Sequence, residues 1–243
     1  MILQTIPHSK ITKYQVYYNK NCAKTMEQIQ QELGCQYMIN TTLFNMDDKS
    51  LAGWLVIDGK VLCDKANPFG LSTNGKELVL SYANGTGWPE FTGCYHDLIR
   101  NRDIVISQED SNRYGKAYRS AIGLKDNGDV VFLCAQEKKS LMEIAILLYN
   151  EGCVTALNYD GGGSSQCYCR GDKLTSSRKV VAYLCIWTDE PKDRADVWAE
   201  ESWGKAKAKK GTDGKSILDG TRPKDNITRQ EFATVLNRLG RLE

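Results

Sequence analysis

An acidic residue followed by three glycines is the feature of this sequence best suited to chemistry. The segment Asn158–Ser165 reads Asn-Tyr-Asp-Gly-Gly-Gly-Ser-Ser and directly follows an apolar run. Glycine takes positive φ angles and lets a ligand approach the backbone closely, and successive N–H groups in such a loop can form an anion-binding concavity. The carboxylate of Asp160 and two serine hydroxyls flank the glycines. The segment predicts a site for a negatively charged oxygen ligand, and the alternative is a plain tight turn.

A second segment repeats part of this arrangement. Cys35–Asn40 and Cys153–Asn158 each follow a glycine at the end of a predicted helix, and each ends in an asparagine before an unusual loop. The first of these loops begins with Thr41 and Thr42. If the two predicted strands are neighbours, the two loops meet at one site. Chance similarity is the alternative, because a helix, a glycine and a strand commonly follow one another.

The elements that must position these loops are mostly strands. Two helices are expected, because Thr25 with Gln28 and Ser140 with Glu143 form capping boxes. Asp58-Gly59 and Asn127-Gly128 are hairpin signals between apolar runs. We therefore predict an α+β fold with mixed, mostly antiparallel sheets and flanking helices. The expected strands lie in segments rich in β-branched and aromatic residues: Leu51–Leu62, Glu77–Ser81, Asp103–Ser107, Ser120–Leu124, Val130–Ala135 and Val180–Trp187.

Composition excludes several classes of function. The net charge of +2 over 243 residues argues against a nucleic-acid partner. No apolar run is long enough to span a membrane, and the N-terminus lacks the pattern of a secretory signal, so we expect synthesis in the cytoplasm. The nine cysteines mostly sit in apolar runs and are expected to be reduced core thiols. With two histidines and a Cys167-Tyr168-Cys169 spacing, no metal site and no cofactor are expected.

The end of the chain differs in composition from the rest. Residues 1–187 are expected to form one domain, residues 188–196 a linker, and residues 197–243 a small helical module. A third capping box, Thr228 with Glu231, supports a helix in that module. About 50 residues bury little surface alone, so the module is expected to dock or to form a homo-oligomer.

Four blocks together resemble one enzyme family. Ala156–Ser165 resembles the signature of the phosphodiester glycosidases, a family that includes N-acetylglucosamine-1-phosphodiester α-N-acetylglucosaminidase, the "uncovering" enzyme. Met38–Phe44 resembles the family's Asn-Gly-Gly-Tyr/Phe-Phe block, and Gly53–Lys60 resembles the hairpin that follows it. Tyr118–Gly123 resembles its Pro-Arg-Thr-Ala-Ile-Gly block. The resemblance spans roughly residues 10–187 and implies hydrolysis of a sugar-1-phosphodiester, of the N-acetylglucosamine type, with a glycosyl-phosphate substrate.

The residues suit this chemistry. A sugar that leaves a phosphate passes through an oxocarbenium-like state, and the leaving phosphate, with a second pKa near 6, needs charge neutralisation more than a strong acid. Arg119 is expected to hold the phosphate, Asp160 to act as nucleophile or base, and His96 to transfer protons. Asn40 and Asn158 are expected to bind sugar hydroxyls or to orient Asp160. The other expected substrate-binding residues are Thr41, Thr42, Gly161, Gly162, Gly163, Ser164 and Ser165.

Each role has a structural alternative. Asp160 could only orient its loop, Arg119 could be a structural arginine, His96 an exposed loop residue, and the asparagines strand caps. Asp97, Glu109, Glu137 and Asp172 remain candidates for a second carboxylate, so retaining or inverting chemistry stays open.

The chain departs from the family pattern at some positions. Thr41 and Thr42 stand in place of two glycines, Tyr118 in place of a proline, and Gln136-Glu137 where Asp-Gly is expected. A non-catalytic module that binds carbohydrate or phosphate is therefore an alternative, as is a hydrolase of a small nucleotide-like diester.

The tail resembles one divergent surface-layer-homology repeat. This rests on Trp203, Gly220, Pro223 and the run Ile227–Phe232. Such a resemblance implies binding of a cell-wall glycan, and it favours a substrate in a wall or capsule polymer of a Gram-positive bacterium or a phage host. The protein would then be virion-associated or released by lysis.

Overall fold

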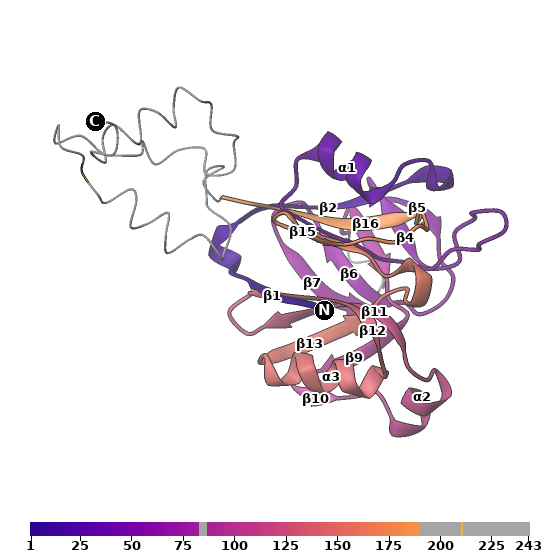
Figure 1. Cartoon of the computed structure of the whole chain (residues 1–243), viewed down its shortest axis with the longest axis vertical. Helices are drawn as coiled ribbons and strands as arrows, with labels where there is room; N and C mark the ends of the chain where they lie inside the picture. The colour runs from indigo at the N-terminus through magenta and orange to yellow at the C-terminus, as the bar shows by residue number, and fades with distance from the viewer. Residues whose placement is uncertain (83–86, 190–209, 211–243) are drawn as a thin grey trace, which may run out of the picture. The chain divides into compact units, whose positions relative to one another are not determined.

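The computed structural model describes residues 1–82, 87–189 and 210, and these form mainly β-structure (Figure 1). Residues 1–189 are one compact unit, and residues 190–243 are a second. The strands fall into three sheets, and every pairing between the described strands is antiparallel. The expected helical module and its surface-layer-homology resemblance lie outside the described residues.

The first sheet has six strands in the order β1-β12-β11-β13-β9-β10. Their bounds are Ile2–Ile6 (β1), Val130–Lys139 (β12), Ala117–Lys125 (β11), Cys153–Asn158 (β13), His96–Arg100 (β9) and Asp103–Ile104 (β10). The predicted turn at Asn127-Gly128 joins β11 to β12, with Gly128 at φ 83°.

The second and third sheets have five strands each. The second has the order β15-β14-β3-β16-β2, with bounds Asp172–Leu174, Cys167–Cys169, Tyr37–Asn40, Ala182–Thr188 and Ile11–Tyr18. The third has the order β5-β4-β8-β6-β7, with bounds Lys60–Cys63, Leu55–Ile57, Glu90–Gly93, Phe69–Thr73 and Leu78–Tyr82.

The helices are few and short. The three α-helices of the described part are α1 (Met26–Leu33), α2 (Gln108–Arg113) and α3 (Leu141–Asn150), with 3₁₀ turns at His8–Lys10, Lys20–Cys22 and Gly162–Ser164. The two capping boxes predicted at Thr25 and Ser140 are present, and the third, at Thr228, lies outside the described residues. None of the described helices has the length and apolarity needed to cross a membrane.

The fold is therefore mostly β rather than α+β, although the mostly antiparallel sheets were predicted correctly. Ser107 explains one local error: its side chain accepts a hydrogen bond from the Asp110 amide and begins α2, so the predicted strand ends at Ile104. Two of the β-segments not predicted, β8 and β14, are short and lack clear alternation of polar and apolar residues. The eight-residue strand β2 was also not predicted.

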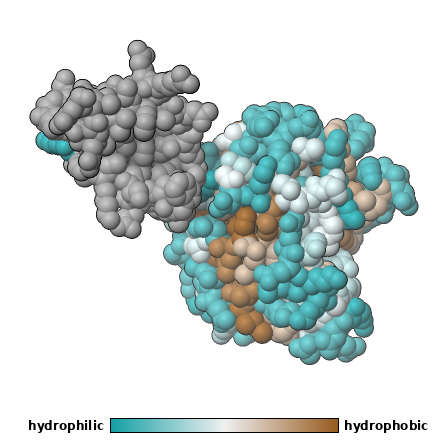
Figure 2. Space-filling model, viewed as in Figure 1, coloured by the Kyte–Doolittle hydropathy of each residue, from teal (hydrophilic) through white to brown (hydrophobic). Residues whose placement is uncertain are grey.

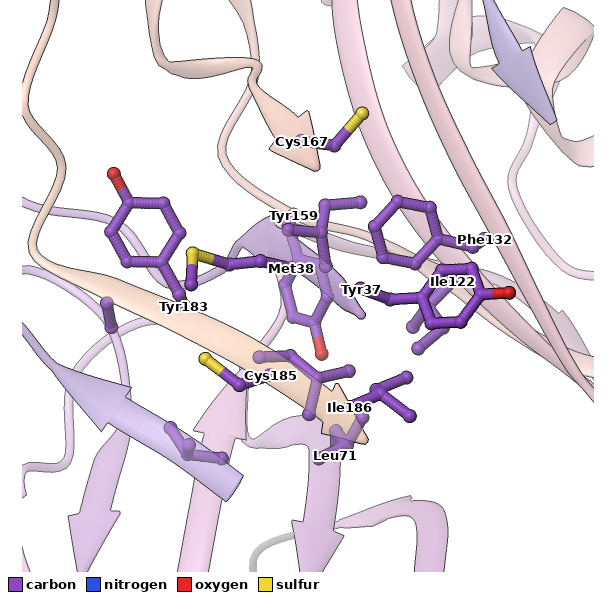
Figure 3. Close-up of a cluster of buried hydrophobic side chains, with 14 of the residues drawn as sticks. Tyr37, Met38, Leu71, Ile122, Phe132, Tyr159, Cys167, Tyr183, Cys185 and Ile186 are labelled. Carbon is purple, nitrogen blue, oxygen red and sulfur yellow. The ribbon is translucent and has the colours of Figure 1, made fainter. Parts of the chain in front are cut away.

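The main core brings all three sheets together around Tyr159. Figure 3 shows this ring among Met38 of β3, Leu71 of β6 and Phe132 of β12. All four side chains are at most 3% exposed. A second core lies between α3 and the first sheet. Tyr159 directly precedes Asp160, so the main core fixes the start of the glycine loop.

The surface seen in Figure 2 is mostly hydrophilic in the described part, with one hydrophobic band across its middle. In the same view, Figure 1 places β1 and α3 in that area. All nine cysteines lie in the described part as free thiols, and eight of them are buried.

Candidate active site

The two loops that the sequence singled out meet, although their strands belong to different sheets. Strand β3 lies between β14 and β16, whereas β13 lies between β11 and β9, so the two are not paired. The loops join by hydrogen bonds instead. The Asp160 amide donates to the Thr41 carbonyl at 3.0 Å, and Asn40 Nδ2 donates to the Asp160 carbonyl at 2.7 Å. Asp160 is thus held at the junction of the first and second sheets.

Asn40 is the hub of this junction. Its side-chain oxygen accepts hydrogen bonds from Ser120 Oγ at 2.6 Å and from the Gln166 amide at 3.1 Å. Together with its bond to Asp160, the Asn40 side chain ties together β3, β11 and the two segments that flank the glycine loop. These bonds fit an orienting function for Asn40 better than direct sugar binding.

The Asp160 carboxyl is a partly buried acid with an altered titration. Burial raises its pKa to about 6, while hydrogen bonds from Ser164 and the Gly161 backbone, and the charge of Arg178, act in the opposite direction. Ser164 Oγ in turn accepts a hydrogen bond from Arg178 Nη1 at 3.1 Å. Arg178, Ser164 and Asp160 form a short polar chain.

Each of the three glycines is required for a different structural reason. A Cβ on Gly161 would lie 2.8 Å from the Tyr118 carbonyl oxygen, and one on Gly163 would lie 2.8 Å from Arg178 Nη2. Gly162 has open space around it but takes φ 57°, in the left-handed region. The loop therefore packs against β11 on one side and against Arg178 on the other.

Substituting Gly161 with alanine is expected to destabilise the protein by about 1–3 kcal/mol, because the new Cβ meets backbone that cannot rotate away. Gly162→Ala is the matched control, and it is expected to cost only about 1–2 kcal/mol of left-handed strain. Urea denaturation of both variants measures the difference. Equal stability of wild type and Gly161→Ala would contradict the close packing of this loop on β11.

Arg119 is buried, and most of its side-chain hydrogen bonds go to backbone carbonyls. Its Nε donates to the Lys139 carbonyl at 3.0 Å, and its Nη2 donates to the Gly115 carbonyl at 2.7 Å. Its Nη1 faces the glycine loop, 3.8 Å from the position a Cβ on Gly161 would take. Burial lowers the pKa of this guanidinium. One edge of the group is thus structural, and the other is directed at Gly161.

Arg178 is the main site residue that sequence reasoning missed. It lies in the polar stretch Thr175–Lys179, where no motif or periodicity marks it. This stretch is bound to the glycine loop at two points, since Ser176 Oγ donates to the Gly163 carbonyl at 2.5 Å and Arg178 contacts Ser164. Gln166 Nε2 also donates to the Arg178 carbonyl at 2.9 Å. The only available signal was an arginine between Ser177 and Lys179, just before a buried strand.

Gln136 has a structural part in the same region. The Gln136 Nε2 donates to the Thr175 carbonyl at 2.6 Å and to the Ser165 carbonyl at 3.4 Å. It therefore connects β12 to both loops that carry the site.

Several buried polar atoms around Asp160 have no hydrogen-bond partner among the described residues. They are Oγ1 of Thr41 and Thr42, Oδ1 of Asn158, Oγ of Ser165 and Nε2 of His96. Buried polar groups are almost always hydrogen-bonded in folded proteins. Five of the twelve such atoms in the described part belong to predicted site residues, where a polar ligand would supply partners.

His96 begins β9, opposite Asn158 of β13, and its ring lies against Tyr114 with centroids 4.3 Å apart. Burial lowers its pKa, with Asp110 and Asp97 opposing this effect. The ring is therefore mostly neutral at pH 7, and His96 is neither fully exposed nor charged.

No second carboxylate acts on Asp160 within the described ranges, because only Ser164, Arg178, Gly161 and burial affect its pKa. Three of the four sequence candidates form surface ion pairs instead: Asp97 with Arg100, Glu109 with Arg113 and Glu137 with Lys139. The described part also holds no group of three or more His, Cys, Asp or Glu side chains suited to a metal ion.

Solved structures with related folds include two of interest. The catalytic domain of zebrafish N-acetylglucosamine-1-phosphodiester α-N-acetylglucosaminidase, auto-inhibited by its pro-peptide, matches with a TM-score of 0.60 at 18% identity, with 74% of each chain covered. A hypothetical protein from Synechocystis matches with a TM-score of 0.61 at 14% identity, covering 76% of this chain and 58% of the other. At these identities the likeness shows the fold.

The family of the chain follows from its sequence. No curated protein sequence matches the chain significantly. The family model for the phosphodiester glycosidases matches residues 33–187, more than half of the chain, and nothing supports the surface-layer-homology repeat expected in the tail. This match includes the glycine loop, Asp160, both arginines and the Asn40 junction, and the chain therefore belongs to the phosphodiester glycosidase family.

Proposed function

We propose that the protein hydrolyses the bond between the anomeric carbon of a sugar and the oxygen of a phosphodiester, with an N-acetylglucosamine-type sugar as the first candidate. One observation carries the proposal. A carboxyl of raised pKa directly precedes a glycine loop that lies between two guanidinium groups, those of Arg119 and Arg178. Sugar chemistry needs the carboxylate, and a phosphate leaving group needs the positive charge.

The phosphate is assigned to the glycine loop. Guanidinium groups are strong hydrogen-bond donors to phosphate oxygens, and one lies at each end of the three glycines. Arg119 offers its Nη1 atom, because its Nε and Nη2 atoms donate to backbone carbonyls. The amides of Gly162 and Gly163 add donors, while those of Ser164 and Ser165 are used inside the turn by the Gly161 and Gly162 carbonyls. This arrangement stabilises the negative charge that the phosphate gains as the bond breaks.

The sugar is assigned to the Asp160 side. In its ionised form Asp160 either removes a proton from a water that attacks the anomeric carbon or attacks that carbon itself, and the C–O bond to phosphate breaks as the new bond forms. After direct attack, water hydrolyses the glycosyl ester of Asp160, which releases the free sugar and regenerates the carboxylate. The leaving phosphate monoester is a weak base, so it needs no strong acid to protonate it. A site with one carboxylate near the loop suits this reaction. The unpaired atoms of Thr41, Asn158 and Ser165 are assigned to sugar hydroxyls, whereas Thr42 Oγ1 lies against Gly53.

The direct test measures release of free N-acetylglucosamine from UDP-N-acetylglucosamine and from a methyl diester of N-acetylglucosamine 1-phosphate. Wild-type protein is expected to release the sugar. Absence of release from both substrates, and from a panel of teichoic-acid-type diesters, would overturn the proposal. Retained binding of these compounds without release would favour a non-catalytic binding module.

The pH dependence provides a separate check. Because Asp160 must be ionised to act, kcat/KM is expected to fall as the pH drops below about 6. The Ser164 hydrogen bond lowers the pKa of Asp160, so Ser164→Ala is expected to move this limb of the profile to higher pH. Ser50→Ala, which removes a serine bound to the exposed Asp48, is the control and should leave the limb in place. If the acid limb of the pH profile does not move in Ser164→Ala, the limb reports the titration of a group other than Asp160.

A further inference from the structure

Three aromatic rings gather beside the proposed catalytic groups. Tyr95, between β8 and β9, has its ring centroid 4.5 Å from that of His96 and 5.4 Å from that of Tyr114, which follows α2. The His96 and Tyr114 centroids are 4.3 Å apart. We call Tyr95, His96 and Tyr114 the aromatic cluster. Two separate chain segments build it, so it depends on the tertiary fold.

The aromatic cluster is joined to the site at both ends. The Tyr95 amide donates to the Asn158 carbonyl at 2.8 Å, two residues before Asp160. The Tyr114 carbonyl accepts a hydrogen bond from Arg119 Nη2 at 3.5 Å. The Tyr95 phenol also interacts electrostatically with both Arg119 and Asp160. The cluster therefore adjoins both Arg119 and the segment that carries Asp160.

The three rings are not fully covered by other parts of the described protein. Tyr114 is 37% exposed, and Tyr95 and His96 are partly exposed, unlike the core aromatic residues. Despite this, the Nε2 atom of His96 is itself buried and lacks a partner among the described residues. An exposed aromatic surface with one unpaired polar atom is typical of a binding site for a small amphipathic ligand.

We propose that the aromatic cluster is the sugar subsite, in which Tyr95 and Tyr114 pack against the C–H face of the pyranose ring and His96 Nε2 hydrogen-bonds one sugar hydroxyl. This rests on the proposed function, because it places the anomeric carbon over Asp160 and the phosphate over the glycine loop. The cluster is thereby the element that selects the sugar, while the loop and the arginines select the phosphate.

The test separates these two parts of the ligand. The full-length Asp160→Asn chain, which does not consume the probe, is mixed with UDP-N-acetylglucosamine, and saturation-transfer NMR reports which protons contact the protein. We expect the pyranose protons to receive more saturation than the uracil protons. Titration calorimetry then compares N-acetylglucosamine 1-phosphate with inorganic phosphate. Tyr114→Ala is expected to weaken the first about three- to tenfold, as for the loss of one aromatic contact, and to leave the second unchanged.

Two further variants complete the design. Tyr114→Phe keeps the ring, and its affinity for the sugar phosphate is expected to equal that of the Asp160→Asn chain. Tyr149→Ala removes an exposed tyrosine outside the cluster and is expected to leave this affinity unchanged. Three results would each overturn the subsite. They are stronger saturation of the uracil protons than of the pyranose protons, an equal loss of affinity for inorganic phosphate and for the sugar phosphate in Tyr114→Ala, and unchanged affinity for the sugar phosphate in that variant. If wild type releases no sugar but pyranose contact still depends on Tyr114, the proposed function fails and the sugar subsite stands.

Discussion

Replacing Asp160 with asparagine is expected to lower kcat for sugar release by about 10³-fold or more, because the amide can neither attack the anomeric carbon nor accept a proton from water. The loop should keep its geometry, since the backbone of Asp160 is held by Thr41 and Asn40 rather than by its own carboxyl. Sugar release under saturating substrate measures the effect. Activity within tenfold of wild type would remove Asp160 from the reaction.

The same substitution is expected to stabilise the fold near neutral pH. Because the folded pKa of Asp160 lies above the ordinary value, the folded state binds protons more tightly than the unfolded chain. Stability from this group is present at low pH and is lost as the pH rises to about 6. Asparagine does not ionise, so Asp160→Asn does not lose this stability as the pH rises. We expect its free energy of unfolding to exceed that of wild type by roughly 1–2 kcal/mol at pH 7.5 and to equal it at pH 3.

Thermal unfolding at the two pH values tests this sign. Asp48 is a matched control, because hydrogen bonds from Ser50 lower its pKa and Asp48→Asn should therefore have the opposite, slightly destabilising effect at pH 7.5. A lower midpoint for Asp160→Asn than for wild type at pH 7.5 would show that the carboxylate supports the fold instead of straining it.

Replacing Arg178 with alanine is expected to lower kcat/KM by about 10²- to 10³-fold, the usual cost of removing one charge-stabilising donor from a transition state. It also removes the donor to Ser164 and an opposing charge near Asp160, so the acid limb of the pH profile should move to higher pH. The fold should be little affected, since Arg178 is only partly buried. Steady-state kinetics between pH 5 and 8 measure both effects.

The control for Arg178→Ala is Arg102→Ala, which removes an exposed arginine paired with Asp126. An unchanged kcat/KM in Arg178→Ala would confine that arginine to a structural function. Arg119→Ala is expected to differ from both, because it leaves the Lys139 and Gly115 carbonyls without a buried donor and should also cost roughly 2–4 kcal/mol of stability.

The glycine loop was predictable because its chemistry is local. Glycine repeats, an adjacent carboxylate and a preceding apolar run all lie within a dozen residues, and each has a direct physical meaning. The capping boxes at Thr25 and Ser140 were found for the same reason. Arg119 was found only through resemblance to a family block, and nothing near it in the sequence shows that Lys139 and Gly115 bind it.

The rest depended on packing between distant segments. Arg178 and the two tyrosines of the proposed sugar subsite, Tyr95 and Tyr114, come from three separate stretches, and no period or spacing links them. The repeated helix and strand pattern correctly suggested that Asn40 and Asn158 end strands beside one site, but it could not reveal that the strands belong to different sheets. Two sheets packed on a shared core can bring their loops together as well as one sheet can.

The close approach of Thr42 to Gly53 limits how this loop can be redesigned. A Cβ on Gly53 would lie only 2.1 Å from Thr42 Oγ1, so the Thr42 side chain occupies the space that a side chain at position 53 would need. Shortening Thr42 alone does not free position 53, because the same Cβ would also lie 3.0 Å from the Leu43 amide nitrogen. A design that adds a side chain at position 53 must therefore change residue 42 and also shift the backbone at Leu43.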